Sequence, residues 1–137
     1  MSDISAALRI LVRERARGRC EYCLIPESAV SVSHQVDHII ALKHGGLTNE
    51  ANLALCCARC NKYKGSDVSS IDPVTGRTEP LFHPRRDQWH EHFELGARIV
   101  GRTPPGRVTV NLLQMNRPER VSEREILIET GLLVLQG

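Results

Sequence analysis

Cys20-Glu-Tyr-Cys23 and Cys57-Ala-Arg-Cys60 repeat one Cys-x2-Cys spacing at two distant places in the chain. Four thiolates in two such pairs are typical ligands of a tetrahedral zinc ion. Because four protein ligands leave no open coordination position, we expect a structural zinc site, which contributes roughly 10 kcal/mol or more of folding free energy. The alternative is four buried free thiols. The fifth cysteine, Cys56, is expected to be a small buried hydrophobic residue, although it could replace Cys57 at a wider spacing.

The composition indicates one ordinary globular chain of 137 residues, with 41% hydrophobic and 25% charged residues. Phe, Trp and Tyr make up only 4% of it, which argues against a broad aromatic platform for single-stranded bases. The net charge of +2 is too small to indicate a nucleic-acid binder by itself. No stretch approaches the roughly 18 apolar residues that span a bilayer. The N-terminus also lacks a charged segment followed by an apolar run, so we expect a cytoplasmic protein that makes no membrane contact. In a reducing compartment the cysteines are expected to bind metal rather than form disulfides, and their odd number excludes complete pairing.

Hydrophobic periodicity and turn residues predict the elements of the first half of the chain. These are an amphipathic helix at 4–17 capped by Ser2 or Asp3, strands at 30–40 and 52–56, and a helix that runs from the second cysteine pair to Gly65. The arginines near the end of the first helix are interpreted as a solvated face that suits the helix dipole. Residues 66–84 hold several Pro, Gly and polar residues and are predicted to be a long connection.

The second half of the chain reads as a separate organisation. We expect a short helix or strand pair around Trp89, hairpin character at 95–100, a helix capped by Thr103, and a last helix at 119–135. The predicted division is therefore a core with its N-terminal helix at 1–70 and a mostly helical C-terminal extension at 71–137.

A polar cluster lies between and just after the cysteine pairs. Asp37 and His38 stand at the end of the first predicted strand, and Asn61 directly follows Cys60. Zinc would draw the two cysteine pairs together, and with them these three side chains. Carboxylate and amide oxygens suit a hard cation such as Mg²⁺. A histidine that ionises near neutral pH is a suitable general base for activating water.

The order of these residues resembles the HNH endonuclease family. The resemblance is carried by His-x2-Asp-His-Ile at 34–39, Gly45-Gly46, and Asn-Leu-x-Leu-x-Cys-x2-Cys-Asn-x2-Lys from Asn52 to Lys64. It covers about residues 20–66 and implies an α+β protein with a zinc-stabilised ββα-metal core. An N-terminal helix before the first cysteine pair is also usual in such proteins.

The resemblance also implies a role for each matching residue. Asp37 and Asn61 would hold the catalytic ion, which the asparagine favours as Mg²⁺ or Mn²⁺ rather than zinc. His38 would be the general base, and Asn52 would brace the loop that orients it. Lys64 and Arg59 would contact flanking phosphates; the alternative for both is a solvated charge on a helix.

The implied activity is metal-dependent hydrolysis of DNA phosphodiester bonds, which leaves 5′-phosphate and 3′-hydroxyl ends. We expect nicking or cutting of double-stranded DNA with little sequence preference, and a homodimer is one way to cut both strands. The main alternative is a zinc-stabilised DNA-binding module without catalysis. A weaker alternative is a ribonuclease or toxin on the same scaffold.

Overall fold

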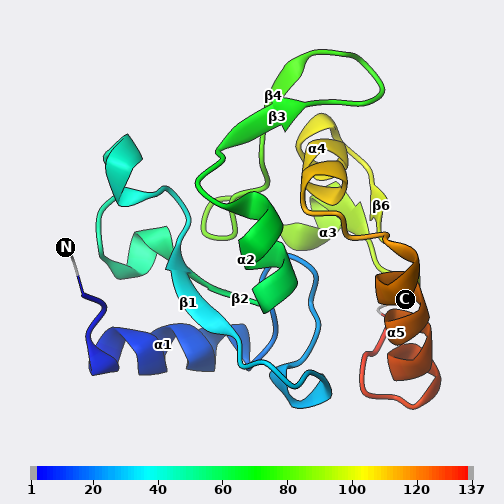
Figure 1. Ribbon diagram of the computed structural model, residues 1–137, viewed down its shortest axis with the longest axis horizontal. Coiled ribbons are helices and arrows are strands. Elements are labelled where there is room, and N and C mark those ends of the chain that lie inside the picture. The colour runs from blue at the N-terminus through cyan, green and yellow to red at the C-terminus, as the bar shows by residue number, and fades with distance from the viewer. Residues whose placement is uncertain (1–2, 136–137) are drawn as a thin grey trace.

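The computed structural model describes residues 3–135. Its α-helices are α1 (Ala6–Ala16), α2 (Ala58–Lys64), α3 (Trp89–His92), α4 (Pro104–Leu112) and α5 (Pro118–Glu129). Short 3-10 turns follow at η1 (Glu27–Ala29), η2 (Leu42–His44) and η3 (Glu50–Asn52). Antiparallel pairs are formed by β1 (Gln35–His38) with β2 (Leu53–Cys56), β3 (Ser69–Ile71) with β4 (Thr78–Pro80), and β5 (Phe93–Glu94) with β6 (Val100–Gly101). This arrangement confirms the predicted α+β class with an N-terminal helix and C-terminal helices (Figure 1).

The N-terminal helix α1 covers one face of the β1–β2 sheet. Its Val12 is fully buried and packs with Val36, Leu53 and Leu55. Burying this aliphatic cluster fixes the helix along the sheet, as Figure 1 shows at the lower left. None of the helices within residues 3–135 is long and apolar enough to cross a membrane.

The start and the arginines of α1 differ from the prediction. The helix is capped by Ser5, whose hydroxyl accepts a hydrogen bond from the Leu8 amide, and not by Asp3; Ser2 lies outside the described residues. The prediction of a solvated arginine face is wrong for two members. Arg13 donates to Glu27 and to the His34 carbonyl, and Arg15 donates to the Leu53 carbonyl. These arginines tie the helix to the sheet edge.

The β1–β2 sheet leads directly into α2. Gln35 pairs with Cys56 and His38 with Leu53, so β1 ends where β2 begins. Cys57 then caps α2, its sulfur accepting from the Cys60 amide. This order gives the ββα arrangement of residues 35–64. The strand predicted at 30–40 is shorter, because the His34 amide donates to Glu27 and its ring bonds the Ile25 carbonyl, which holds this stretch away from β2.

Residues 66–84 are not the unstructured connection that their Pro and Gly content predicted. They contain the β3–β4 hairpin, which stands at the top of Figure 1. Asp72 begins its turn: its carboxylate accepts from the Val74 amide and the Thr75 hydroxyl, and takes two hydrogen bonds from Arg107 of α4. A polar turn thus anchors the hairpin, which apolar periodicity could not reveal.

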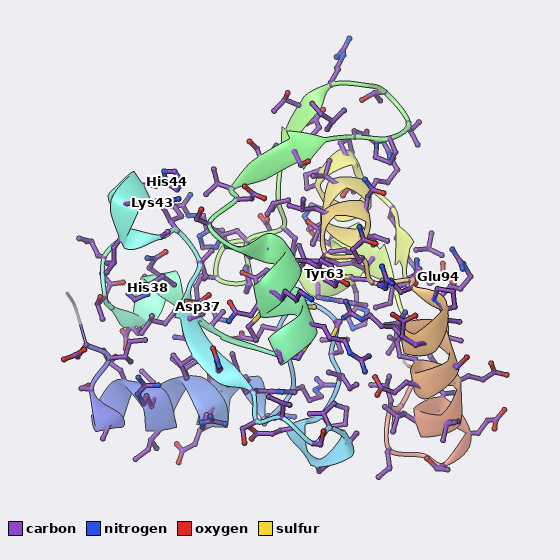
Figure 2. The ribbon with its side chains drawn as sticks, in the orientation of Figure 1. Asp37, His38, Lys43, His44, Tyr63 and Glu94 are labelled. Carbon is purple, nitrogen blue, oxygen red and sulfur yellow. The ribbon has the colours of Figure 1, made fainter. Side chains whose placement is uncertain are left out.

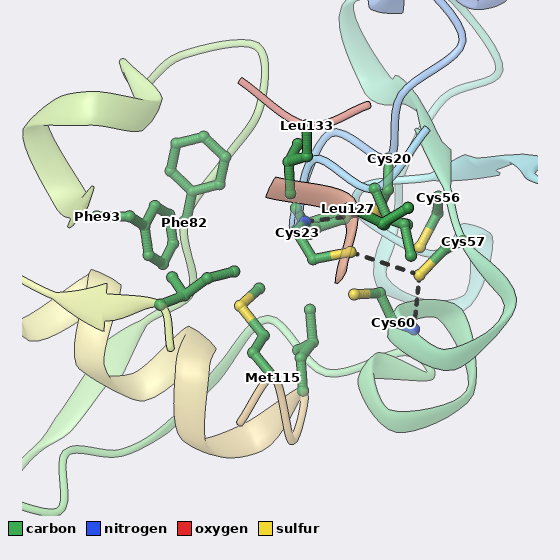
Figure 3. Close-up of a cluster of buried hydrophobic side chains, with 14 residues drawn as sticks. Cys20, Cys23, Cys56, Cys57, Cys60, Phe82, Phe93, Met115, Leu127 and Leu133 are labelled. Carbon is green, nitrogen blue, oxygen red and sulfur yellow. Dashed lines mark hydrogen bonds between the residues drawn. The ribbon is translucent and has the colours of Figure 1, made fainter. Parts of the chain in front are cut away.

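The C-terminal part packs on the cysteine end of the core. As predicted, Thr103 caps α4. Val108 of this helix, and Leu113 and Met115 just after it, are fully buried. The last helix is shorter than predicted and ends at Glu129. One buried cluster joins both halves of the chain; among its members are Cys20, Cys23, Cys57, Cys60, Phe82, Phe93, Met115, Leu127 and Leu133 (Figure 3).

Candidate active site and metal centre

Four cysteine sulfurs meet in the interior where the first cysteine turn faces the start of α2. The Sγ atoms of Cys20, Cys23, Cys57 and Cys60 all lie within 4.8 Å of one another, and all four residues are buried. Cys23 Sγ lies 3.7 Å from Cys57 Sγ (Figure 3). Within each pair, the amide of the second cysteine donates to the sulfur of the first. The predicted partners therefore converge, and Cys56 is buried outside this group.

The chemistry of this donor set fits a structural zinc ion. Zinc takes four thiolates in a tetrahedron, and four protein ligands leave no position for water. Burial raises the pKa of the Cys20 thiol, so four thiolates can coexist here only with a cation between them. All five cysteines are free of disulfides, which leaves the four sulfurs available as ligands.

At the other end of the sheet, β1 finishes with Asp37 and His38, both only partly buried. The His38 ring nitrogen Nε2 lies 2.8 Å from the hydroxyl oxygen of Thr48. Figure 2 shows Asp37 and His38 together at this end of β1, with Lys43 and His44 in the loop beyond. The hydrogen bond to Thr48 fixes the imidazole ring and leaves Nδ1 as the nitrogen that can face a water.

Asn52 holds the loop that follows His38. Its Oδ1 accepts from the Ile40 amide, and its Nδ2 donates to the carbonyls of Ile40 and Leu47. Asn52 is buried, so these bonds are shielded from water. Gly46 makes the approach possible, because a Cβ there would lie 1.8 Å from the Ile40 oxygen and 2.8 Å from Asn52 Nδ2.

The helix α2 lies across the face of β1 that carries Asp37. Its Asn61 donates to the Gln35 side chain at 3.1 Å, and its Lys64 ammonium donates to the Ile39 carbonyl at 2.9 Å. These two contacts fall at Gln35 and Ile39, two residues before and two residues after Asp37. Side chains two apart in a strand share a face, so Asp37 lies on the face of β1 that carries Gln35, the partner of Asn61. The Oδ1 atom of Asn61 takes no part in the bond to Gln35.

The comparison with family models agrees with this geometry. Residues 20–67 match the family model of the HNH endonucleases. We refer to this matching segment, residues 20–67, as the HNH domain. No curated protein and no solved structure matches the chain.

Lys64 and Arg59, the two candidate phosphate contacts of the HNH domain, differ in their exposure to solvent. Lys64 is only 4% exposed, so it is neither a solvated charge nor an open phosphate contact. Burial lowers the pKa of Lys64, and the negative charge of Asp37 opposes that effect. Arg59 stays more open, with its side chain 46% exposed and an ion pair to Glu123 of α5 at 3.1 Å.

Three residues that contact the candidate sites were not predicted from the sequence. Thr48 bonds His38, Gln35 bonds Asn61, and Arg120 of α5 donates to Cys60 Sγ at 3.2 Å. Thr48 and Gln35 are single polar residues in a loop and a strand, and neither belongs to a sequence motif that would indicate its role. Arg120 is one of two arginines in its helix and lies far from the HNH domain in the sequence.

A groove borders the HNH domain on the side of the C-terminal part. Its volume is about 520 Å³, and its lining includes Ile39, Lys64, Val68, His83 and Arg86. It therefore begins beside the end of β1 and continues along residues 80–87. Its walls are mostly apolar, with cationic groups of Lys64 and Arg86 among the polar ones.

Proposed function

We propose that this protein is a divalent-metal-dependent endonuclease that hydrolyses DNA phosphodiester bonds. The proposal rests on three features: Asp37 and His38 stand next to each other at the end of β1, Asn61 of α2 bonds Gln35 of the same strand, and the segment that holds them matches the HNH family. A zinc module without catalysis has no need for an acid, a histidine and an asparagine at the seam between β1 and α2. The HNH family itself implies a nucleic-acid substrate.

The donor atoms of this seam suit a hard divalent cation. We propose that the Asp37 carboxylate and the Asn61 Oδ1 hold Mg²⁺ or Mn²⁺. When bound, such an ion neutralises the charge that develops on the phosphate and the leaving 3′ oxygen. Gln35 orients the Asn61 amide through its bond to Nδ2, so that Oδ1 is presented as the ligand.

His38 then acts as the general base. We propose that the Nε2–H group donates a hydrogen bond to the hydroxyl oxygen of Thr48. The other ring nitrogen, Nδ1, is then unprotonated and can take a proton from the attacking water. Asn52 contributes indirectly, because it fixes the loop from Ile40 to Leu47 and thereby the position of Thr48.

The surroundings of the seam suggest how DNA is held. We propose that Arg59, which keeps much of its side chain in solvent, contacts a flanking phosphate. Lys64 does not contact the DNA in this proposal. Its buried ammonium donates to the Ile39 carbonyl just after β1, and its positive charge interacts with the carboxylate of Asp37. Phosphate contacts of this kind make DNA binding weaken steeply with salt and favour cleavage with little sequence preference.

Three further parts of the proposal concern context. We propose a cytoplasmic enzyme whose HNH core and N-terminal helix occupy residues 1–70, with residues 71–137 packing on it as an extension; residues 1–2 and 136–137 lie outside the described residues. One active site cuts one strand. Cleavage of both strands therefore requires a homodimer or two successive events.

The test is cleavage of supercoiled plasmid DNA with Mg²⁺, Mn²⁺ or EDTA, for the wild type and His38→Ala. We expect nicking with either metal, none with EDTA, and a loss of about 10²–10⁴-fold in His38→Ala with unchanged zinc content. His90→Ala is the matched control, because His90 is an exposed histidine of α3 whose ring packs on Trp89. Cleavage by His38→Ala at the wild-type rate would refute the mechanism.

The same assay separates the alternatives. DNA binding without cleavage in any metal would favour the zinc-stabilised binding module. Cleavage of an RNA of the same sequence but not of DNA would favour a ribonuclease on this scaffold.

A further inference from the structure

Two arginines of α5 are buried beside the sulfur cluster. Arg120 and Arg124 are each 2% exposed, although a cation is rarely buried without an anion to balance it. Across residues 3–135, neither forms an ion pair with a carboxylate. Their counter-charge must therefore come from another kind of group.

The contacts of Arg120 identify that group. One guanidinium nitrogen donates to Cys60 Sγ at 3.2 Å, and the other donates to the carbonyls of Leu113 and Gln114 at 2.8 and 3.3 Å. The carbonyls satisfy donors but bring no net charge. A thiolate at Cys60 does both, since it accepts the hydrogen bond and neutralises the cation.

The zinc site needs a cation for the same reason. A zinc ion with four thiolates keeps a net negative charge, because the four anions outnumber the two positive charges of the ion. A buried anion of this kind is costly unless it is paired and hydrogen-bonded. The guanidinium of Arg120 needs a negative charge beside it, and the zinc–thiolate site needs a positive charge and a hydrogen-bond donor. Each supplies what the other needs.

We propose that Arg120 is a positioning residue of the zinc site, which donates an N–H···S hydrogen bond to the Cys60 thiolate and supplies its counter-charge. The zinc site then extends beyond the HNH domain of residues 20–67 and includes a residue of the C-terminal part. This inference concerns zinc retention and does not depend on nuclease activity.

A cavity next to Arg120 gives dissolved molecules a route to the sulfur cluster. About 420 Å³ of space opens between η1 and α5 and is lined by Cys23, Cys57 and Arg120, among others. A chelator or oxidant that enters it meets the sulfurs from this side. A hydrogen-bonded thiolate is a weaker nucleophile than a bare one, so Arg120 slows the loss of the ion through this opening.

The chain offers a matched control one helical turn further on. Arg124 is equally buried on α5, but it donates to the carbonyls of Ala97 and Met115 and to the Asn116 side chain, with no bond to sulfur. Arg120→Met and Arg124→Met remove the same groups from the same helix. Only the first removes a contact to a zinc ligand.

The experiment measures zinc affinity by competition with a colorimetric chelator, and the sulfur-to-metal charge-transfer band of the cobalt-substituted protein. We expect Arg120→Met to lower zinc affinity by about 10–100-fold and to shift the cobalt band to lower energy. Arg120→Lys keeps the charge and should recover part of the affinity. Arg124→Met should change the affinity much less and leave the cobalt band in place.

Two results would overturn the proposal. One is an unchanged cobalt band and wild-type zinc affinity in Arg120→Met. The other is an equal loss of affinity in Arg124→Met, which would mean that α5 acts by packing alone. If Arg120→Met does not fold, Arg120→Lys decides, because a wild-type cobalt band in that variant contradicts a specific guanidinium–sulfur bond.

Discussion

The β1–β2 sheet carries a candidate site at each end, and the two sites are held together differently. At the end where Gln35 pairs with Cys56, the chain continues into a closed cluster of four buried sulfurs. At the end where His38 pairs with Leu53, the side chains of Asp37 and His38 are only partly buried. Since a strand rises about 3.3 Å per residue, only roughly 10 Å of sheet separates the two ends.

The comparison shows two ways to keep reactive groups in place. At the sulfur end, the four cysteines are themselves part of the buried core, and a zinc ion held by them would join segments that are distant in sequence. At the His38 end, the groups proposed for chemistry are positioned by residues that carry none, chiefly Asn52 and Thr48. Damage at the first end should therefore unfold the protein, and damage at the second should spare the fold and reduce activity.

The largest effect is expected from Cys20→Ser. Losing the zinc site removes roughly 10 kcal/mol, which is comparable to the whole stability of a domain. We expect loss of zinc, of the cooperative thermal transition and of cleavage together. Metal analysis and a circular dichroism melt check this.

Cys56→Ser is the control for that variant, because Cys56 is an equally buried cysteine outside the group of four. It should keep its zinc and melt at a modestly lower temperature. If Cys56→Ser loses zinc while Cys20→Ser retains it, the ligand set is wrong.

The next effect is expected from Asn52→Ala. The variant loses three hydrogen bonds and leaves the Ile40 amide unpaired, so the loop to Thr48 loosens while the sulfur cluster is untouched. We expect plasmid cleavage to fall by on the order of 100-fold, since small displacements of catalytic groups have effects of this size. Zinc content should stay at the wild-type level.

Asn49→Ala is the matched control in the same loop. Its side chain accepts only from the Ala51 amide and is exposed. Equal losses of cleavage in both variants would mean that the loop as a whole, and not the bracing by Asn52, controls the site.

A smaller effect is expected from Thr48→Val, which keeps the shape of the side chain but removes the hydroxyl that contacts His38. One hydrogen bond contributes about 1 kcal/mol, so cleavage should fall about fivefold and Thr48→Ser should restore it. The pH dependence of the cleavage rate distinguishes positioning from packing. A change in rate without any change in that dependence would speak against a role for Thr48 in setting the protonation of His38.

Most of the HNH domain could be predicted because its elements depend on patterns of residues that are close together in the sequence. The cysteine spacing, the aliphatic periodicity of α1 and the order of Asp37, His38, Asn52 and Asn61 are all visible in the sequence, and residues 20–67 match the family. Asn52 bonds Ile40 and Leu47 in the loop after His38; that this orients His38 stays a prediction. The catalytic roles of these residues stay predictions until cleavage is measured.

The rest depends on contacts between segments that are far apart in the chain. Arg13 was expected on a solvated face, and only packing shows that it bonds the His34 carbonyl. Packing alone likewise shows that Arg120 bonds the sulfur of Cys60. Lys64 was expected to contact a phosphate or to lie in solvent, yet it is buried and its ammonium donates to the Ile39 carbonyl. The β3–β4 hairpin was missed because polar contacts of its turn, not alternation of apolar residues, stabilise it.

The smallest effect is expected far from both ends of the β1–β2 sheet, at the ion pair between Asp72 and Arg107. Two hydrogen bonds from Arg107 hold the pKa of Asp72 at about 2, below its ordinary value of 3.8. Because the pKa is lowered in the folded state, this contribution is complete above pH 3.8 and disappears as the pH falls through about 2. Asp72→Asn should therefore lower Tm by a few degrees at neutral pH, and the difference from the wild type should close in acid.

Zinc affinity and plasmid cleavage should not change, because the pair anchors the hairpin and touches neither site. An equal loss of Tm from Asp72→Asn in an Arg107→Met background would show that the hydrogen bonds to Val74 and Thr75, and not the ion pair, stabilise this turn.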